Sequence, residues 1–218
     1  MPYQAVLFDM DGTVLDTLED LTDAVNVSLN RFNLPEVSSS HVRKNLGHGA
    51  RYLIAHCLPS GCEDAFITQV LDFYRPWYDS HCRVRTAPYA GMPELMQEFR
   101  AAGILLAVIS NKPDAAVREL ADAFFPNLLF CAVGEREGNR IKPYPDAVFD
   151  AVRQLGIPRE QCVYVGDSEV DVQTAANAGM DMIAVAWGFR DEDDLIAAGA
   201  ETIVHNMEEL KERIMIHG

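Results

Sequence analysis

Two aspartates, Asp9 and Asp11, lie near the start of the chain, directly after the apolar run Ala5–Phe8. That run is typical of a buried strand, and alternate residues of a strand point to the same side. If the chain stays nearly extended through Asp11, the two carboxylates aim at one point. There each raises the pKa of the other unless a cation or a shared proton intervenes. Gly12 gives room for an unusual turn. The alternative is an acidic turn, since Asp and Gly are common turn residues.

Three other segments place polar residues where apolar runs end or where a helix begins. They contribute Ser110 and Asn111 after residues 104–109, Lys142 before a helical pattern, Asp167 after residues 163–165, and Asp171 about one turn later. In a sheet of parallel strands, these points lie along one edge, where the ligand crevice forms. The sequence therefore predicts a crevice lined by four carboxylates, a lysine and a hydroxyl group: Asp9, Asp11, Asp167, Asp171, Lys142 and Ser110.

Such a crevice indicates phosphoryl chemistry. Several carboxylates in a small space need a cation, and oxygen ligands favour Mg²⁺, which completes its octahedron with waters and substrate phosphate. Lys142 would place a compact positive charge on a phosphoryl oxygen. The Ser110 hydroxyl and backbone N–H groups at a helix start could hold the remaining oxygens. In phosphoryl transfer, positioning and charge neutralisation dominate catalysis. We therefore expect Mg²⁺ as the cofactor and a small anionic phosphorylated molecule as the substrate.

Short apolar runs alternate with helical patterns along most of the chain. Strands are predicted at residues 5–8, 104–109, 128–133, 162–165 and 182–186. Apolar residues at helical spacing predict helices at residues 93–102, 114–125 and 146–155. Alternation of this kind is typical of βαβ units, and continuous apolar strands fit a sheet that is covered on both faces. We predict an α/β fold with a doubly wound parallel sheet.

One stretch interrupts the alternation. Residues 17–86 contain no convincing strand and show three helical patterns. The simplest interpretation is a helical domain inserted after the first strand, so that residues 1–16 and 87–218 form the α/β core and residues 17–86 form a helical cap. The alternative is a few extra helices packed on the sheet.

Composition limits the partners and the compartment. Among 218 residues, 18 are basic and 33 acidic, which gives a formal charge of −15. This surface would repel nucleic acid and anionic membranes. The five cysteines form no C-x-x-C pair, and no basic segment followed by an apolar stretch opens the chain. We predict a cytoplasmic protein without nucleic-acid or membrane partners. The oligomeric state stays open.

The motifs, in order, resemble those of the haloacid dehalogenase superfamily. The resemblance rests on residues 9–13 (DMDGT), Ser110, the Lys142-Pro143 pair, and residues 166–171 (GDSEVD). It extends from Asp9 to about Arg190, and the inserted helices resemble the cap of members whose cap follows the first motif. Residues 110–113 (SNKP) and 187–191 (WGFRD) are most similar to the phosphoglycolate phosphatase branch.

The resemblance implies roles by position. Asp9 would be the nucleophile that forms an aspartyl-phosphate. Asp11 would protonate the leaving group and then deprotonate the attacking water. Mg²⁺ would be held by Asp9, the backbone carbonyl of Asp11, and Asp167. Asp171 would serve as a further ligand or orient a metal-bound water or Lys142. The residues that would bind the phosphoryl group are Ser110, Asn111 and Lys142.

The cap contains a glycine-bracketed turn at residues 46–51 (LGHGAR). It resembles the substrate-specificity loop of capped members, which would place His48 or Arg51 over the leaving group. An exposed loop with ordinary polar residues is the alternative. The aromatic residues near the end of the cap are predicted to form its core: Phe73, Tyr74, Trp77 and Tyr78.

The resemblance thus favours a Mg²⁺-dependent phosphatase for a small phosphomonoester, with phosphoglycolate as the first candidate. Alternatives within the superfamily are an inorganic pyrophosphatase and a phosphosugar mutase or phosphatase. A phospho-receiver signalling module would also carry acidic residues and a lysine at strand ends, but such domains are roughly half as long and lack a helical insertion.

Overall fold

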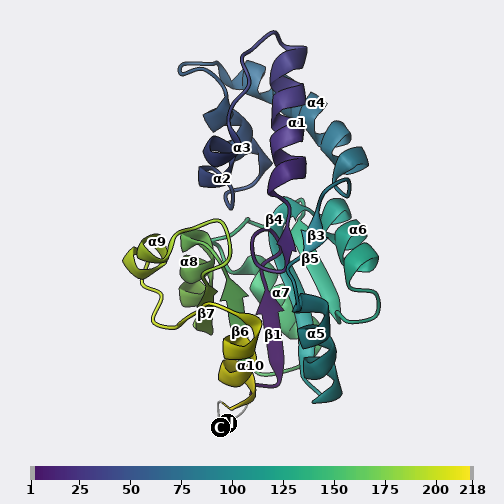
Figure 1. Ribbon diagram of the computed structural model, residues 1–218, viewed down its shortest axis with the longest axis vertical. Helices are drawn as coiled ribbons and strands as arrows, with labels where there is room; N and C mark the ends of the chain where they lie inside the picture. The colour runs from purple at the N-terminus through teal and green to yellow at the C-terminus, as the bar shows by residue number, and fades with distance from the viewer. Residues whose placement is uncertain (1–2, 217–218) are drawn as a thin grey trace.

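A six-stranded parallel sheet forms the centre of the protein in this computed structural model, which describes residues 3–216 (Figure 1). The strand order is β5-β4-β1-β6-β7-β8. The strands are β1 (Ala5–Phe8), β4 (Leu105–Pro113), β5 (Cys131–Glu135), β6 (Cys162–Gly166), β7 (Asp181–Val185) and β8 (Ile203–Val204). All their pairings are parallel. The first strand lies in the middle, so its carboxyl end opens at the centre of the sheet edge.

Helices cover both faces of the sheet. They are α5 (Met92–Ala101), α6 (Asp114–Phe124), α7 (Asp146–Leu155), α8 (Glu169–Ala178), α9 (Glu192–Ala197) and α10 (Met207–Met215), with a short 3-10 helix at Arg159–Gln161. Along β1, Val6 and Phe8 are fully buried in one apolar cluster, and Leu7 is fully buried in a second. Because alternate residues of a strand face opposite sides, the protein has one core layer on each face. The predicted doubly wound α/β fold is confirmed.

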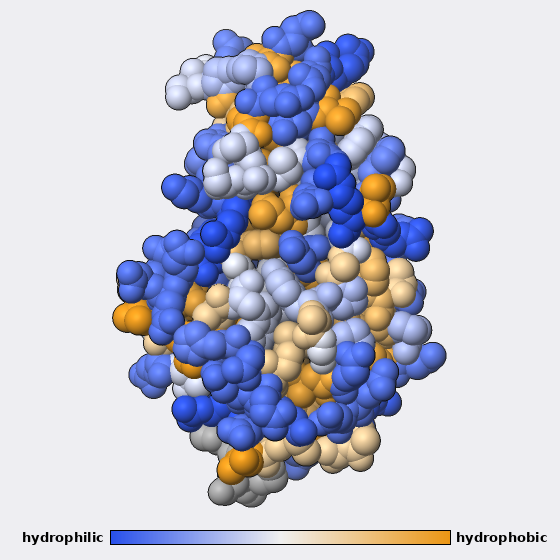
Figure 2. All heavy atoms as spheres, in the orientation of Figure 1, coloured by the Kyte–Doolittle hydropathy of each residue, from blue (hydrophilic) through white to orange (hydrophobic). Residues whose placement is uncertain are grey.

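The segment that interrupts the strand pattern is helical, as predicted, and lies beyond the carboxyl end of the sheet, at the top of Figure 1. Its helices are α1 (Leu18–Arg31), α2 (Ser39–Lys44), α3 (Ala50–Cys57) and α4 (Asp64–His81). On the face shown in Figure 2, hydrophilic residues dominate, and apolar residues gather where these helices meet the sheet. A two-stranded antiparallel ladder of β2 (Leu15–Asp16) and β3 (Ala87–Pro88) joins its two ends. We keep the name helical cap for residues 17–86; its standing as a separate domain stays a prediction.

Some elements differ from the sequence-based expectation. The run at residues 128–133 becomes a strand only from Cys131. Helix α2 and the two-residue strands were not expected, because such short elements carry too little periodicity to register. All five cysteines are free. Within residues 3–216, no helix is long and apolar enough to span a membrane.

A buried carboxylate closes the base of the helical cap. Asp20, in the first turn of α1, is only 2% exposed. Its oxygens accept hydrogen bonds from the backbone N–H of Arg85 at 2.9 and 3.0 Å and of Thr86 at 2.9 Å. The start and the end of the cap are therefore tied together where both segments connect to the sheet.

We expect Asp20→Ala to lower the free energy of unfolding by about 1.5–3 kcal/mol, since it removes a charged acceptor and leaves two backbone donors unpaired. Urea unfolding followed by circular dichroism measures the change. Asp72→Ala is the control, because Asp72 is exposed on α4 and no hydrogen bond or ion pair of its side chain is found among residues 3–216. Equal stability of Asp20→Ala and wild type would contradict the assignment.

Candidate active site

The site begins at the carboxyl end of β1, where Asp9 is only 6% exposed. The backbone N–H of Asp9 donates to the Val165 carbonyl of β6 at 2.8 Å, which fixes the chain as it leaves the sheet. The ammonium group of Lys142 donates to Asp9 Oδ1 at 2.5 Å and to Asp171 Oδ1 at 2.7 Å. Lys142 is itself buried. The structure therefore places a lysine between two carboxylates from different elements.

Three buried carboxylates form the acidic cluster of the site. One oxygen each of Asp9, Asp167 and Asp171 lies within 4.8 Å of the others. Asp167 accepts from Thr13 Oγ1 at 2.9 Å and from the Phe189 N–H at 2.7 Å. These bonds fix the direction of the carboxylate, and a hard cation such as Mg²⁺ fits an all-oxygen set of this kind.

The acidic cluster lacks balancing charge. Burial raises the pKa of Asp9 well above its usual value, and repulsion by Asp171 adds to this, while Lys142 opposes it. Burial and Asp171 likewise raise the pKa of Asp167 to about 7, against hydrogen bonds from Phe189 and Thr13. Burial lowers the pKa of Lys142, but Asp171 and Asp9 outweigh it, and the pKa rises. A further positive charge would stabilise the ionised carboxylates.

Both carboxylate oxygens of Asp171 accept hydrogen bonds within the protein. Its second oxygen accepts from Ser168 Oγ at 2.5 Å and from the Ser168 N–H at 3.1 Å, in a capping box at the start of α8. Its first oxygen accepts from Lys142 and, at 3.2 Å, from the Tyr164 hydroxyl. Both oxygens are thus engaged by the protein, which supports a positioning role for Asp171.

Two glycines let the chain approach Asp167. Gly12 has φ +88°, and a Cβ there would lie 2.3 Å from Asp167 Oδ2. A Cβ at Gly188 would lie 2.3 Å from Asp167 Cβ. Any side chain at either position would push into this carboxylate. The loops after β1 and β7 therefore need glycine here to form the site.

Asp11 faces the helical cap. Its Oδ1 accepts from Thr17 Oγ1 at 2.6 Å and forms an ion pair with Lys112 Nζ at 3.0 Å. Lys112 also donates to the Tyr78 hydroxyl of α4 at 2.6 Å. Asp9 and Asp11 line the same cavity, but the side chain of Asp11 lies outside the acidic cluster. The two aspartates therefore have different surroundings.

Ser110 and Asn111 lie in the last part of β4. Ser110 lines the cavity, and its Oγ accepts from the Lys112 N–H at 3.2 Å. Asn111 Oδ1 accepts from the Lys142 N–H at 2.7 Å, and its Nδ2 donates to the carbonyls of Lys142 at 3.0 Å and Gly47 at 2.9 Å. Both N–H donors of Asn111 are therefore used. This side chain fixes the loop that carries Lys142 instead of offering free donors to a phosphoryl group.

The helical cap forms the other wall of the cavity. Its contribution includes Leu21, Leu46, Gly47, Gly49, Ala50, Leu53, Tyr74, Arg75, Tyr78 and Asp79. Tyr74 and Tyr78 are buried, as predicted for cap core, yet they also line the cavity together with Arg75. Sequence reasoning missed this function of α4; positions 74, 75, 78 and 79 share one helical face, which is the signal that could have revealed it.

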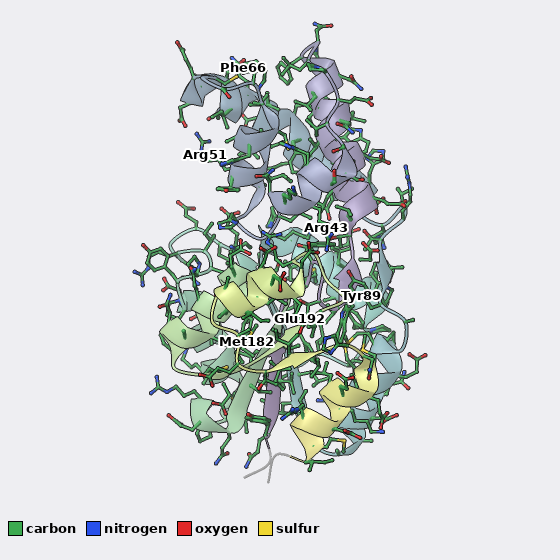
Figure 3. The ribbon with its side chains drawn as sticks, turned by 60° about the vertical axis from the view of Figure 1, so that its left-hand side comes forward. Arg43, Arg51, Phe66, Tyr89, Met182 and Glu192 are labelled. Carbon is green, nitrogen blue, oxygen red and sulfur yellow. The ribbon has the colours of Figure 1, made fainter. Side chains whose placement is uncertain are left out.

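Arg51 and His48 are not brought to the cavity wall. The Arg51 guanidinium pairs with Asp64 and donates to Thr68 Oγ1 at 3.2 Å. Arg51 lies at the side of the helical cap in Figure 3, away from its junction with the sheet, where Arg43 is labelled. The His48 ring stacks on Tyr52, with ring centroids 4.4 Å apart. The expectation that Arg51 binds substrate is therefore not supported; the neighbouring Ala50 and Leu53 face the cavity instead.

Comparison with known proteins adds to the geometry. The profile of the family described as haloacid dehalogenase-like hydrolase matches residues 6–185. The chain is 32% identical to an N-acetylmuramic acid 6-phosphate phosphatase of Pseudomonas aeruginosa over 215 residues, covering 96% of this chain and 94% of that protein. It is 31% identical to a phosphoglycolate phosphatase of Xanthomonas campestris pv. campestris over 219 residues, covering 96% and 95%.

A solved structure is similar over nearly the full length. It comes from Lactobacillus delbrueckii subsp. bulgaricus, and its assignment as a phosphoglycolate phosphatase is provisional. The TM-score is 0.95 at 38% identity, covering 99% of each chain. The family profile spans the elements that carry Asp9, Lys142 and Asp167, and the fold places these side chains together. The chain belongs to the haloacid dehalogenase-like hydrolase family.

Proposed function

We propose that this protein is a Mg²⁺-dependent phosphatase that hydrolyses a small phosphomonoester through an aspartyl-phosphate on Asp9. The observation that carries the proposal is the buried Asp9 carboxylate at a strand end, beside Lys142 and within the acidic cluster. Asp9, Asp167 and the backbone carbonyl of Asp11 would hold Mg²⁺. When bound, the ion would neutralise charge on the carboxylates and on the phosphoryl oxygens.

Asp9 would act as the nucleophile. One of its oxygens forms a bond to phosphorus while the bond from phosphorus to the ester oxygen breaks. Lys142, held by Asp171, lies beside Asp9 and would offset the charge of the incoming phosphoryl oxygens. Ser110 would donate its hydroxyl to one of those oxygens. The buried lysine thereby allows an anionic nucleophile to approach an anionic substrate.

Asp11 would move the proton. Its carboxyl group would give a proton to the departing ester oxygen and take one back from the water that attacks the aspartyl-phosphate. That attack breaks the bond between Asp9 and phosphorus, which releases inorganic phosphate and restores both aspartates. Thr17 and Lys112 hold the Asp11 side chain at the boundary with the helical cap. A closed cap would also exclude bulk water from the intermediate.

Phosphoglycolate is the first candidate substrate. The chain is similar to a phosphoglycolate phosphatase and to an N-acetylmuramic acid 6-phosphate phosphatase at nearly equal identity. Phosphoglycolate and N-acetylmuramic acid 6-phosphate share one feature: each carries a carboxylate besides its phosphate. The second candidate is therefore a sugar phosphate of this kind. Membership of a hydrolase family favours hydrolysis over a phospho-receiver function.

Asp9→Asn is expected to abolish phosphate release while the fold stays intact, because the amide is a poor nucleophile. Asp11→Asn should lower turnover by about 10²–10⁴-fold, the usual contribution of a general acid or base. Phosphate release from phosphoglycolate, sugar phosphates, nucleotides and pyrophosphate, with Mg²⁺ and with chelator, measures both effects.

Asp72→Asn serves as the control variant, since this exposed aspartate of α4 is not part of the cavity wall. Near-normal turnover by Asp9→Asn would contradict the assignment of Asp9 as the nucleophile. Activity that is indifferent to the chelator would exclude the metal.

Mg²⁺ binding should strengthen as pH rises towards about 7, because the ion competes with a proton on Asp167. Without metal, the pKa of Asp167 is higher in the folded protein than its ordinary value of 3.8. Its contribution to stability is thus largest at low pH and is lost as pH rises through about 7. Thermal unfolding with and without Mg²⁺, at about pH 5.5 and about pH 8, should show the larger shift at the higher pH.

Asp167→Asn should remove most of this Mg²⁺-induced shift, and Asp72→Asn should keep it. An equal shift at both pH values in the wild type would contradict a metal site that contains Asp167.

A further inference from the structure

We propose that Arg75 of helix α4 binds a carboxylate on the leaving group and so selects phosphomonoesters that carry one. The inference rests on the proposed phosphatase function and specifies its substrate class. It starts from the position of Arg75 in the wall of the cavity that also contains Asp9, Ser110 and Lys142. The residues proposed to act on the phosphate lie on the sheet side of that cavity. Arg75 lies on the cap side and contributes a guanidinium group.

The guanidinium of Arg75 is left without a hydrogen-bonding or ion-pair partner among the described residues. Among residues 3–216, its guanidinium forms no hydrogen bond or ion pair, and its Nε is buried without a hydrogen-bond partner. Three other arginines among the described residues form no side-chain hydrogen bond or ion pair, and all three are exposed: Arg31, Arg100 and Arg213. A buried donor that stays unpaired is costly, and more so when it belongs to a charged group. Arg75 therefore needs an acceptor that the described protein does not supply.

Among the described residues that line the cavity, the other two cationic side chains already have partners. Lys142 is engaged by Asp9 and Asp171, and Lys112 by Asp11 and Tyr78. Asp79 lies one turn after Arg75 on the same helical face and also lines the cavity. Partial burial raises the pKa of Asp79 and the charge of Arg75 opposes this rise, but Asp79 is exposed and forms no ion pair with Arg75 among the described residues. An anionic group of the substrate would thus meet Arg75 as the free positive charge on the cap side.

The chemistry of the guanidinium favours a carboxylate. Nε and one terminal nitrogen of an arginine present two parallel N–H groups, which match the two oxygens of a carboxylate. Next to Arg75, Tyr74 and Tyr78 are buried, and burial raises the pKa of both phenols, so both are neutral. Leu46 and Leu53 form apolar parts of the wall. A short carbon chain between phosphate and carboxylate would lie against this surface.

Arg75 would discriminate between esters because it stays unpaired when an ester without a carboxylate binds. An ester with a neutral leaving group gives the buried Nε no charged acceptor, and the cost of desolvation is then not recovered. A substrate with a carboxylate recovers it. Selection of this kind acts on the relative affinity for two esters and leaves the phosphoryl chemistry at Asp9 unchanged.

The test compares kcat/KM for matched pairs of esters in the full chain with Mg²⁺. One pair is phosphoglycolate and 2-hydroxyethyl phosphate, which differ in the carboxylate; the other is N-acetylmuramic acid 6-phosphate and N-acetylglucosamine 6-phosphate. For the pair that the wild type hydrolyses, the preference for the carboxylate ester should fall by about tenfold or more in Arg75→Gln, mainly through KM. Arg75→Lys keeps the charge but not the two parallel donors and should lose less of the preference.

Arg31→Gln is the control, because Arg31 is an exposed, unpaired arginine of the cap that does not line the cavity; it should keep the wild-type preference. A wild-type preference in Arg75→Gln, or in Arg75→Met if the first variant does not fold, would overturn the assignment. So would a wild type that hydrolyses both members of a pair equally. If the wild type releases no phosphate from any ester, the proposed function itself fails, which is a separate result.

Discussion

The site depends on one electrostatic constraint, the burial of three carboxylates, those of Asp9, Asp167 and Asp171, beside the buried ammonium group of Lys142. Asp9 and Asp171 both contact Lys142, and Asp167 lies beside them without a cation of its own. Ionised groups of one sign this close are unfavourable in a dry interior. A bound cation would supply the positive charge that these carboxylates lack. Under the proposed function, that cation and Lys142 would then share the negative charge of an incoming phosphoryl group.

The fold brings the charged side chains of the site close together. The central strand β1 delivers Asp9 between two parallel neighbours, and the Val165 carbonyl fixes its backbone. Gly12 and Gly188 let two loops approach Asp167 where any side chain would clash. Asn111 then ties the loop of Lys142 to β4 and reaches the cap through Gly47. Hydrogen bonds to the backbone thus fix both the main chain at Asp9 and the loop that carries Lys142.

Much of the sheet side of the site could be predicted from sequence, because the carboxyl ends of parallel strands lie along one edge of the sheet. Asp9 and Asp167 follow predicted strands and Lys142 precedes a predicted helix, and the shared carboxyl edge of parallel strands brings such positions near one another. The cap could not be predicted as well. Arg51 was expected over the substrate, but α3 turns Ala50 and Leu53 to the cavity and leaves Arg51 to pair with Asp64. Arg75 was missed, because the rotation of α4 depends on its packing against α1 and α3, which a single helical pattern does not encode.

The central claim is that Asp9 carries the phosphoryl group during turnover. The most direct measurement is rapid acid quenching of the protein during hydrolysis of phosphoglycolate with Mg²⁺, followed by peptide mass spectrometry. If Asp9 is the nucleophile, the peptide that contains it gains the mass of one phosphoryl group, with Asp9 as the modified residue. The modification then disappears when substrate is exhausted. A phosphoryl group on any other residue, or active turnover with Asp9 unmodified throughout, would contradict it.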